Sequence, residues 1–341
     1  MVSVIVPCRN EQKWIGPCLE SIATNDYPKD RLEAFVVDGM SGDGTRAVVE
    51  SFAARHGWIR LLDNPRKITP TALNLGIAAA RGSVIVRMDA HVEYPTDYIS
   101  SLVRLLDQTG ADNVGGVCQT RPGSGTAMAR AVAVGLSHPL GVGNSYFRIG
   151  SAEPRWVDTV PFGCYRRDVF DRIGLFDEEL VRNQDDEFNL RLIRRGGRIL
   201  LCPQVVSYYY ARDSVRKLGR MYYQYGYFKP LVVRKVGGVM TVRQLGPPLF
   251  VAGLAAAAVL APWSRPAAAA LAGVLSLYVL TIALVAATTV ARHGLRTALG
   301  LFLVFPAMHF GYGVGYLRGI LDFVIRRKRV AADKGNIPIS R

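Results

Sequence analysis

The stretch SVIVRMDAHVE, residues 83–93, is a short apolar run that ends in an acid and an imidazole. Such a run is typical of a buried β-strand. Asp89 and His91 are two positions apart, so on an extended chain their side chains point to the same side. The pair could hold one small cation, or it could simply end a strand in solvent.

Short apolar runs alternate with helical patterns through the first third of the chain. This order predicts an α/β fold, Rossmann-like, with a mainly parallel sheet covered on both faces. Ligands bind such sheets beyond the carboxyl ends of the strands. Arg9, Asp38 and Asp89 fall at three of these ends, so we expect them to share one cleft. The expected strands are residues 2–7, 34–38, 58–62 and 83–88, and the expected helices are 11–24, 45–55 and 71–81.

The composition of the 341-residue chain changes near residue 236. Before this point charged, apolar and turn residues mix as they do in a soluble domain. Three apolar spans follow, at about residues 247–263, 266–291 and 297–317, and each approaches or exceeds the ~20 residues of a membrane-crossing helix. The middle span is the clearest of the three. A buried core helix is the alternative for each.

The net charge is +15, and the basic residues gather beside these apolar spans. Their placement favours an anionic membrane surface, where each basic residue contributes roughly 1 kcal/mol. Nucleic acid is not an expected partner, because neither zinc-finger spacing nor a basic-region heptad accompanies the charge. The five cysteines form no C-x-x-C pair, which favours a reducing cytoplasm over a disulfide framework.

The basic run at residues 326–329 creates a conflict over orientation. If the soluble domain is cytoplasmic and all three spans cross once, this run lies outside. Lys and Arg instead prefer the cytoplasmic side of a membrane. One span could therefore be re-entrant or interfacial, which leaves an even number of crossings. The sequence leaves open which span that is.

Polar turns follow the first two expected strands. Pro7, Arg9 and Glu11 close the first strand, and Asp38 begins a Gly-rich turn into a helix, where free amides suit phosphate. Acids at such turns suit hydrogen bonds to a uracil edge or a ribose hydroxyl. An Asp-Gly turn with a Thr cap is also ordinary in loops, and Asp43 is better explained as a turn or capping residue.

Residues in two further segments are candidates for the phosphate end of a nucleotide. Lys67, before the helix that carries Asn74, could compensate a diphosphate or could be a solvated charge. Asp89 and His91 could bind a divalent ion that a diphosphate already chelates. The imidazole makes the site softer, which shifts the expected preference from Mg²⁺ towards Mn²⁺.

Three consecutive acids open the helical pattern after residue 183. Asp185, Asp186 and Glu187 cannot all face one way, because adjacent helical residues diverge by about 100°. At most one of them can be a general base that takes a proton from an acceptor hydroxyl.

These motifs together resemble the family 2 glycosyltransferases of the GT-A fold over residues 2–195. PCRNE (7–11) is similar to the family's P-x-[RY]-N-E, and DGMSGDGT (38–45) to its D-G-S-x-D-G-T. DAH (89–91) occupies the place of the D-x-D metal motif, and QDDEFNLRL (184–192) resembles E-D-x-D-L-x-L-R-L. Register on Arg191 implies that Asp185 is the catalytic base. His91 and Gln184 depart from the family pattern, which puts metal affinity in question and removes one charge beside the base.

Both departures recur in a subgroup similar to the succinoglycan-biosynthesis ExoA glucosyltransferases. Residues 138–145 and 160–167 also resemble this subgroup.

The residues and the resemblance together predict a nucleotide-sugar site and an acceptor side. For the nucleotide sugar we expect Pro7, Arg9, Glu11, Asp38, Lys67, Asn74 and Asp89, with Asp89 and His91 holding Mn²⁺ or Mg²⁺. For the acceptor we expect Gly163, Arg166, Asp186 and Arg220.

The expected function is an inverting hexosyltransferase that acts in exopolysaccharide or cell-surface glycan synthesis. It would move a hexose, with UDP-glucose as the expected donor, to a lipid-linked saccharide at the cytoplasmic face of a bacterial-type inner membrane. A polyprenyl-phosphate glycosyltransferase is one alternative. A catalytically silent nucleotide-sugar-binding subunit is another. The predicted layout is a GT-A domain at 1–211, amphipathic interface helices at 212–244, two or three membrane helices at 245–325 and a basic cytoplasmic tail at 326–341.

Overall fold

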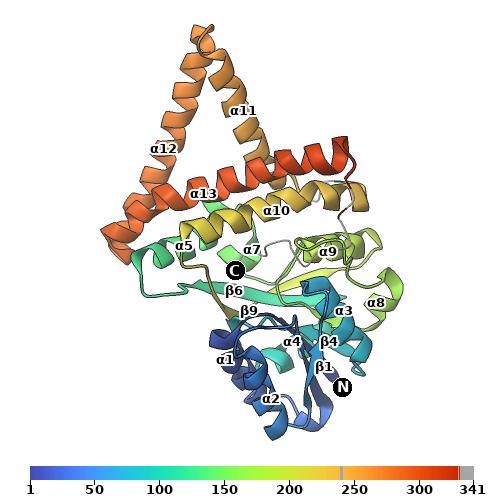
Figure 1. Ribbon diagram of the computed structural model, residues 1–341. Helices are drawn as coiled ribbons and strands as arrows, with labels where there is room; N and C mark the ends of the chain where they lie inside the picture. Colours follow the sequence, from blue (N-terminus) through green and yellow to red (C-terminus); the bar gives the residue numbers. More distant parts are fainter. Residues whose placement is uncertain (239–240, 329, 331–341) are drawn as a thin grey trace. The chain divides into compact units, whose positions relative to one another are not determined.

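The computed structural model describes residues 1–238, 241–328 and 330, which divide into two compact units (Figure 1). The first unit contains Met1–Gln119 and Tyr146–Tyr209. The second contains Thr120–Ser145 and the described residues of 210–328. Thr120–Ser145, which the sequence places in the catalytic domain, therefore packs with the helical unit.

The first unit is built on a mixed sheet, which contains nine strands in the described residues. The strand order is β3-β2-β1-β4-β8-β6-β9-β5, and β7 pairs with β9. Strands β3, β2, β1 and β4 are parallel, and the pairs of β8, β5 and β7 are antiparallel. The strands are β1 (Val2–Cys8), β2 (Leu32–Asp38), β3 (Ile59–Asp63), β4 (Val84–Arg87), β5 (Val92–Glu93), β6 (Asn113–Arg121), β7 (Arg155–Trp156), β8 (Cys164–Arg166) and β9 (Ile199–Tyr210).

The expected α/β fold is confirmed, and the alternation of the first third corresponds to the parallel half of the sheet. β1 and β2 are buried at every position, which matches strands covered on both faces. The helices of this unit are α1 (Gln12–Ala23), η1 (Lys29–Arg31), α2 (Thr45–Arg55), α3 (Thr69–Ala79), α4 (Tyr98–Thr109), α7 (Tyr146–Ile149), α8 (Asp168–Ile173) and α9 (Gln184–Arg194).

An aromatic cluster fixes α9 to the sheet. Phe188 is fully buried, and its ring centroid lies 4.4 Å from that of Phe176. Tyr165 on β8 meets Phe188 edge to face at 5.5 Å, and Phe170 on α8 lies 5.3 Å away. Such aromatic pairs contribute about 0.5–1.5 kcal/mol each beyond their buried area. Phe188 is one turn beyond Asp185, so this cluster also fixes the position of the first turn of α9.

The second unit is helical. Its elements are α5 (Ala127–Ser137), α6 (Pro139–Val142), α10 (Val215–Val236), η2 (Val242–Leu245), α11 (Gly246–Leu260), α12 (Arg265–His293), α13 (Leu295–Gly319) and η3 (Ile320–Ile325). In Figure 1, α11 and α12 form a hairpin, and α10 and α13 lie side by side. Pro306 and several glycines lie within α13, and the helix is continuous through them.

Glycines bring the backbones of α10 and α13 into contact. A Cβ atom added to Gly315 would lie 2.2 Å from the carbonyl oxygen of Tyr223, and one added to Gly319 would lie 2.2 Å from that of Tyr227. From α10, a Cβ atom on Gly226 would meet the carbonyl oxygen of Tyr312 at 2.0 Å. Small residues spaced four apart are the usual means of close helix packing in membrane proteins. The glycines of α13 therefore serve packing.

Within the described residues, three segments are long and apolar enough to cross a membrane. They are Val242–Leu260, Arg265–His293 and Leu295–Ile325, with mean hydropathies of 1.3, 2.3 and 1.4. These three segments are candidate membrane helices, and the middle segment is the most apolar, as expected. The predicted tail at 326–341 lies outside the described residues except for 326–328 and 330.

Candidate active site

The carboxyl ends of β1, β2 and β4 form the floor of the candidate site. Cys8 pairs with Asp38 across β1 and β2, and Ile5 pairs with Arg87 across β1 and β4. Because these strands are adjacent and parallel, Arg9, Asp38 and Asp89 emerge at one edge of the sheet. The side chain of Arg9 packs against Gly39, where an added Cβ atom would lie 3.2 Å from its Cβ and Cδ atoms.

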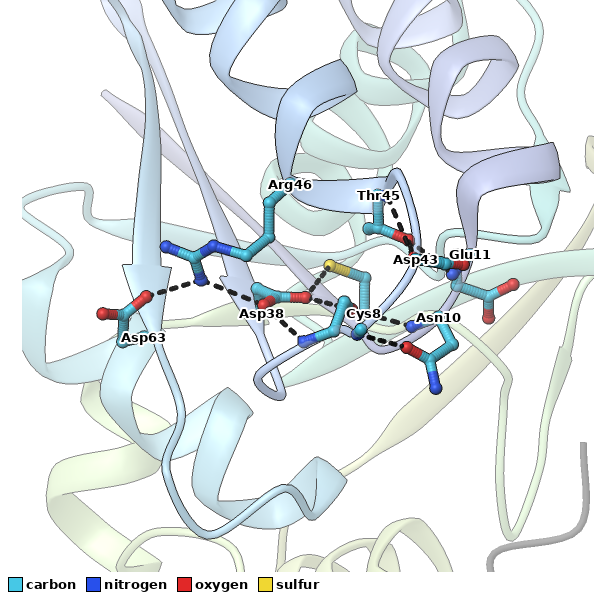
Figure 2. A network of polar contacts seen from close by, with 10 residues as sticks. Cys8, Asn10, Glu11, Asp38, Asp43, Thr45, Arg46 and Asp63 are labelled. Atoms are coloured by element: carbon cyan, nitrogen blue, oxygen red, sulfur yellow. Dashed lines mark hydrogen bonds and ion pairs between the residues drawn. The ribbon is translucent and has the colours of Figure 1, made fainter.

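Asp38 is fully buried and organises the turn after β2 (Figure 2). Its carboxylate accepts a 2.9 Å hydrogen bond from the backbone N–H of Ser41 and another from the Ser41 hydroxyl. Arg46 pairs with Asp38 at 3.0 Å and with Asp63 at 2.7 Å. The sequence identified Asp38 and missed Arg46, which is the second residue of α2 and supplies the counter-charge for the buried acid.

The turns after β1 and β2 bind each other through Asp43 and Thr45 (Figure 2). Asp43 accepts hydrogen bonds from the backbone N–H groups of Thr45 at 2.9 Å and Gln12 at 3.2 Å. Slight burial acts against its charge, but these bonds and one from the Thr45 hydroxyl lower the pKa of Asp43. The Thr45 hydroxyl in turn accepts the backbone N–H of Glu11 at 2.7 Å. Asp43 is thus a turn residue, which is the role the sequence favours.

Arg87 joins the metal motif to the start of α9. Its Nε and Nη2 atoms donate to the two oxygens of Asp89 at 2.8 and 3.2 Å, and its Nη1 atom donates to Asp185. Only 9% of the Arg87 side chain is exposed. Burial opposes its charge, yet Asp185 and Asp89 outweigh that effect and raise the pKa of Arg87. The guanidinium therefore remains a fixed cation between two acids.

Asp185 lies in the first turn of α9, after Asn183 in the left-handed region (φ 62°). Its side chain is about one-third exposed. Burial of the carboxyl raises the pKa of Asp185, the charge of Arg87 opposes this rise, and the nearby Asp89 adds to it. A carboxylate with a raised pKa that is accessible from one side suits a general base.

Backbone strain concentrates in the loops around this edge. A positive φ is uncommon for residues other than glycine and costs about 1–3 kcal/mol where it is unfavourable. Six such residues occur in the described part of the chain, and five of them are in loops that carry candidate site residues. These five are Asn10, Met40, Lys67, Phe162 and Asn183.

His91 lies beside Glu11 in an arrangement that fits a metal ligand. Its Nδ1 atom is 3.3 Å from Oε1 of Glu11, which is buried, and its ring meets Tyr209 edge to face at 5.3 Å. A carboxylate at Nδ1 fixes the tautomer and leaves Nε2 as the ligand atom, as in many metal sites. The described residues include no group of three or more metal-binding side chains, so Asp89 and His91 alone would leave most of the coordination of a divalent ion to other ligands.

Asn74 has a structural function. Its side chain amide donates to the carbonyl oxygen of Phe176 at 2.9 Å and to Glu178 at 3.0 Å, and its Oδ1 atom accepts the backbone N–H of Phe176 at 3.0 Å. These bonds join α3 to the segment before α9. Lys67, in contrast, lies in a loop where its φ is positive, and its side chain is half-buried.

Replacing Asn74 with Ala should lower the free energy of unfolding. The change leaves the buried peptide groups of Phe176 without partners, which costs about 2–4 kcal/mol in total. Thermal unfolding of the purified protein in detergent measures the effect. Leu75→Ala, at the exposed neighbouring position, is the control and should change stability by less than about 0.5 kcal/mol. Equal losses in the two variants would contradict a structural function for Asn74.

Among the predicted acceptor-side residues of the first unit, Arg166 lies apart from Gly163. Gly163 borders β4, where its carbonyl oxygen accepts the backbone N–H of Arg87 at 3.0 Å. Arg166 pairs with Val84 at the opposite end of β4 and donates to the carbonyl oxygen of Leu106 at 2.7 Å, so the structure does not bring it to the site. Asp186 is beside Asp185 on α9, and Arg220 belongs to α10 in the second unit.

Arg87 is the main residue that the sequence analysis missed. One signal was available, because Arg87 and Asp89 are two positions apart at the end of a strand and so share a side. Its second partner, Asp185, is 98 positions away and could not be deduced from spacing. The parallel strand ends and the acid-bearing first turn of α9 thus form one charged cluster that Arg87 holds together.

A parallel half-sheet with acids at its strand ends, continued by an antiparallel half beside an acid-bearing helix, defines the GT-A fold of glycosyltransferases. Residues 3–174 match the model of glycosyl transferase family 2. The chain belongs to this family.

The chain also resembles individual proteins along much of its length. It is 31% identical over 332 residues to the succinoglycan biosynthesis protein ExoA of Rhizobium meliloti (strain 1021), covering 96% of each chain. A dolichyl N-acetyl-alpha-D-glucosaminyl phosphate 3-beta-D-2,3-diacetamido-2,3-dideoxy-beta-D-glucuronosyltransferase of Methanococcus voltae is 31% identical over 242 residues, which cover 69% of this chain and 74% of that protein.

A solved structure supports the fold over most of the chain. The mannosyltransferase PcManGT from Pyrobaculum calidifontis, solved with GDP-Man and Mn²⁺, matches with a TM-score of 0.56 and 24% identity. The match covers 90% of this chain and 86% of that one. At this identity the similarity shows the fold alone.

Proposed function

We propose that this protein is an inverting glycosyltransferase that moves a hexose from a nucleotide-diphosphate sugar to a lipid-linked saccharide. The observation that carries the proposal is the Arg87 bridge between Asp89, on the donor side, and Asp185, on the acceptor side. One cation thus connects the acid expected at the leaving group to the acid expected to act as base. One relative acts in succinoglycan biosynthesis and another is named for a dolichyl-linked sugar, and both support a lipid-linked acceptor.

In the proposed site, the nucleoside end of the donor is bound by Arg9, Glu11 and Asp38. Pro7 lies beside these residues in the chain. Lys67 lies on a strained loop from which it could reach the diphosphate. Asp89 and His91 would hold a divalent cation, Mn²⁺ or Mg²⁺, which when bound would supply positive charge to the leaving diphosphate. The proposal leaves out Asn74 and Arg166, because their side chains bind structural partners.

The proposed transfer is a single displacement. Asp185 takes the proton of an acceptor hydroxyl as the oxygen attacks the anomeric carbon from the face opposite the diphosphate. The new carbon–oxygen bond forms while the bond to the diphosphate breaks, and the nucleotide leaves with the electron pair. Asp186 and Gly163 border the acceptor side. No covalent intermediate with the protein is needed, so the anomeric configuration inverts.

A donor panel tests the proposal. Membranes that contain the protein are offered UDP-glucose and other nucleotide sugars, with Mn²⁺, Mg²⁺ or chelator, in the presence and absence of a lipid-linked saccharide extract. The expected result is metal-dependent nucleotide release that requires the acceptor, with inverted configuration in the product by NMR. Retained configuration would exclude the single displacement. Donor binding without nucleotide release would favour the silent binding subunit.

The raised pKa of Asp185 predicts the acid side of the pH profile. The base acts only when it is deprotonated, so activity should fall as the pH drops through its pKa. Because that pKa lies above the ordinary value of about 3.9, the fall should occur at higher pH than for an exposed aspartate. Measurement of kcat/KM from pH 4 to 9 at constant metal concentration checks this. A profile that stays flat down to about pH 4 would contradict it.

A further inference from the structure

The three membrane-competent helices are not equivalent in their surroundings. α13 packs against α5, α10, α11 and α12, whereas most of the apolar side chains of α12 are exposed. We propose that α13 lies along the membrane surface, and that α11 and α12 alone cross the bilayer as a hairpin. This assignment gives two crossings and concerns the attachment to the membrane, so it does not depend on the proposed reaction.

The first half of α13 is covered by α5 and α6. The Nε atom of Arg130 lies 3.4 Å from the Thr297 hydroxyl, and a Cβ atom on Gly135 would lie 2.5 Å from Val304. Nε2 of His309 is 2.8 Å from the carbonyl oxygen of Leu140. The segment with α5 and α6 leaves the soluble domain after β6 and returns to it at Tyr146, so it stays on the domain's side of the membrane. The half of α13 up to His309 must stay on that side too.

The second half of α13 is covered by α10. The contacts between the two helices extend from the pair Gly219 and Ala307 to the pair Tyr227 and Gly319. The two helices must therefore lie at the same depth in the membrane. α10 cannot enter the hydrocarbon, because each Lys or Arg at the bilayer centre costs about 2.5–3.5 kcal/mol or more. The basic residues of α10 are Arg216, Lys217, Arg220, Lys229, Arg234 and Lys235.

A polar cluster fixes the end of α13 to α10. Asp322 is buried and accepts a hydrogen bond from the Tyr227 hydroxyl at 3.1 Å. It also forms ion pairs with Arg318 and Lys328, each at 3.1 Å. In a crossing helix this cluster would need to reach the far side of the membrane, away from Tyr227. If α13 lies along the membrane surface, the cluster stays beside α10.

The outer face of α13 is apolar in one stripe. Leu295, Leu299, Leu303 and Val314 are exposed, at intervals of four, four and eleven residues, which place them on one side of a helix. One apolar stripe opposite a protein-covered face is the pattern of an interfacial helix, which inserts about 5–10 Å into the membrane. The partner of this face is therefore the lipid surface.

α11 and α12 have the surroundings of crossing helices. α12 has 29 residues, about 40 Å of helix, which exceeds the ~30 Å of hydrocarbon. Its exposed apolar residues face several directions, among them Leu275, Leu277 and Val279, which lie on opposite sides of the helix. Trp263 and Arg265 are at the tip of the hairpin, where tryptophan and arginine anchor a helix end in the far interface.

Two crossings also resolve the conflict over the basic segments. Arg292 and Arg296 at the junction of α12 and α13, and Arg326 after η3, then lie on the same side as α10. That distribution follows the preference of Lys and Arg for the cytoplasmic side. A third crossing would move Arg326 and Lys328 to the opposite side.

A disulfide test examines the position of α13. The Cβ atom that Gly219 would carry lies 3.7 Å from that of Ala307, which suits a disulfide. The double variant Gly219→Cys with Ala307→Cys should form the bond in isolated membranes. The control pair, Gly219→Cys with Leu303→Cys on the lipid-facing stripe, should form it at least about tenfold less. Equal crosslinking in the two pairs, or none in either, would overturn the proposal.

Labelling from one side of sealed vesicles counts the crossings. The five natural cysteines are buried, so an introduced cysteine gives the signal under native conditions. Glu50→Cys on α2 reports the side of the domain, Trp263→Cys the hairpin tip and Arg327→Cys the chain after η3. We expect Arg327→Cys to be labelled with Glu50→Cys, and Trp263→Cys from the other side. Labelling of Arg327→Cys with Trp263→Cys would show three crossings, and labelling of all three from one side would show none. Either result would overturn the proposal.

Discussion

Asp185→Asn is expected to lower the rate of sugar transfer by roughly 10²–10⁴-fold, the usual contribution of a general base. The amide cannot take the acceptor proton, but it keeps the size of the carboxyl and can still accept a hydrogen bond from Arg87. Donor affinity should therefore change little. Transfer rates with a lipid-linked saccharide, together with nucleotide-sugar binding by calorimetry, measure the two quantities separately.

Asp186→Asn is the matched control for this prediction. It removes the same charge at the next position, which points about 100° away on the helix. Its transfer rate should stay well above that of Asp185→Asn. Near-normal transfer by Asp185→Asn would exclude Asp185 as the base. If that activity appeared only with a bare polyprenyl phosphate, whose oxygen is already ionised, the polyprenyl-phosphate alternative would be favoured.

Arg87→Met is expected to damage both stability and transfer. It leaves Asp89 and Asp185 without the cation that lies between them, in a site where Arg87 itself is almost fully buried. Removing one partner of a buried ion pair costs about 3–5 kcal/mol, and roughly 2–4 is expected here because Asp185 is about one-third exposed. Without Arg87, the pKa of Asp185 should rise further, so transfer at neutral pH should fall. Thermal unfolding and the pH profile of kcat/KM measure the two effects.

Two variants make the Arg87 prediction specific. Arg87→Lys keeps the charge but cannot donate in a fixed fork to two carboxylates, so it should recover only part of the loss. Arg172→Met removes an arginine that pairs with Asp112 and Asp168 and is 44% exposed, and it should cost about 1 kcal/mol or less. A loss in Arg87→Met no larger than in Arg172→Met would show that the bridge has little effect.

The parallel half of the sheet could be predicted because each of its strands is a mainly apolar run that is followed by a polar turn. The antiparallel half gave no comparable signal. β5 and β7 have two residues each and β8 has three, which is too short for a pattern of side chains to be visible. Their positions depend on contacts such as that between Tyr165 and Phe188, which join distant parts of the chain.

The part of the site that could be predicted consists of polar residues at the ends of the parallel strands. Asp38 and Asp89 were identifiable because ligands bind where parallel strands end. Asn74 was assigned to substrate because nothing in the sequence shows that its amide binds Phe176, 102 positions away. Hydropathy likewise treats α13 as a membrane span, because the index does not distinguish an apolar side chain that faces protein from one that faces lipid.

The close contact of α10 and α13 has a consequence for how the gene can vary. On one side of α13, Leu299 and Leu303 meet lipid, where any apolar residue of ordinary size can substitute. On the other side, a Cβ atom added to Gly315 or Gly319 would lie 2.2 Å from a carbonyl oxygen of α10, which is too close for any side chain. A codon change on the first side should be silent in a growth selection, and one on the second side should be lethal wherever the glycan is essential. A saturation library of this one helix would therefore separate into permissive and forbidden positions with the period of the helix.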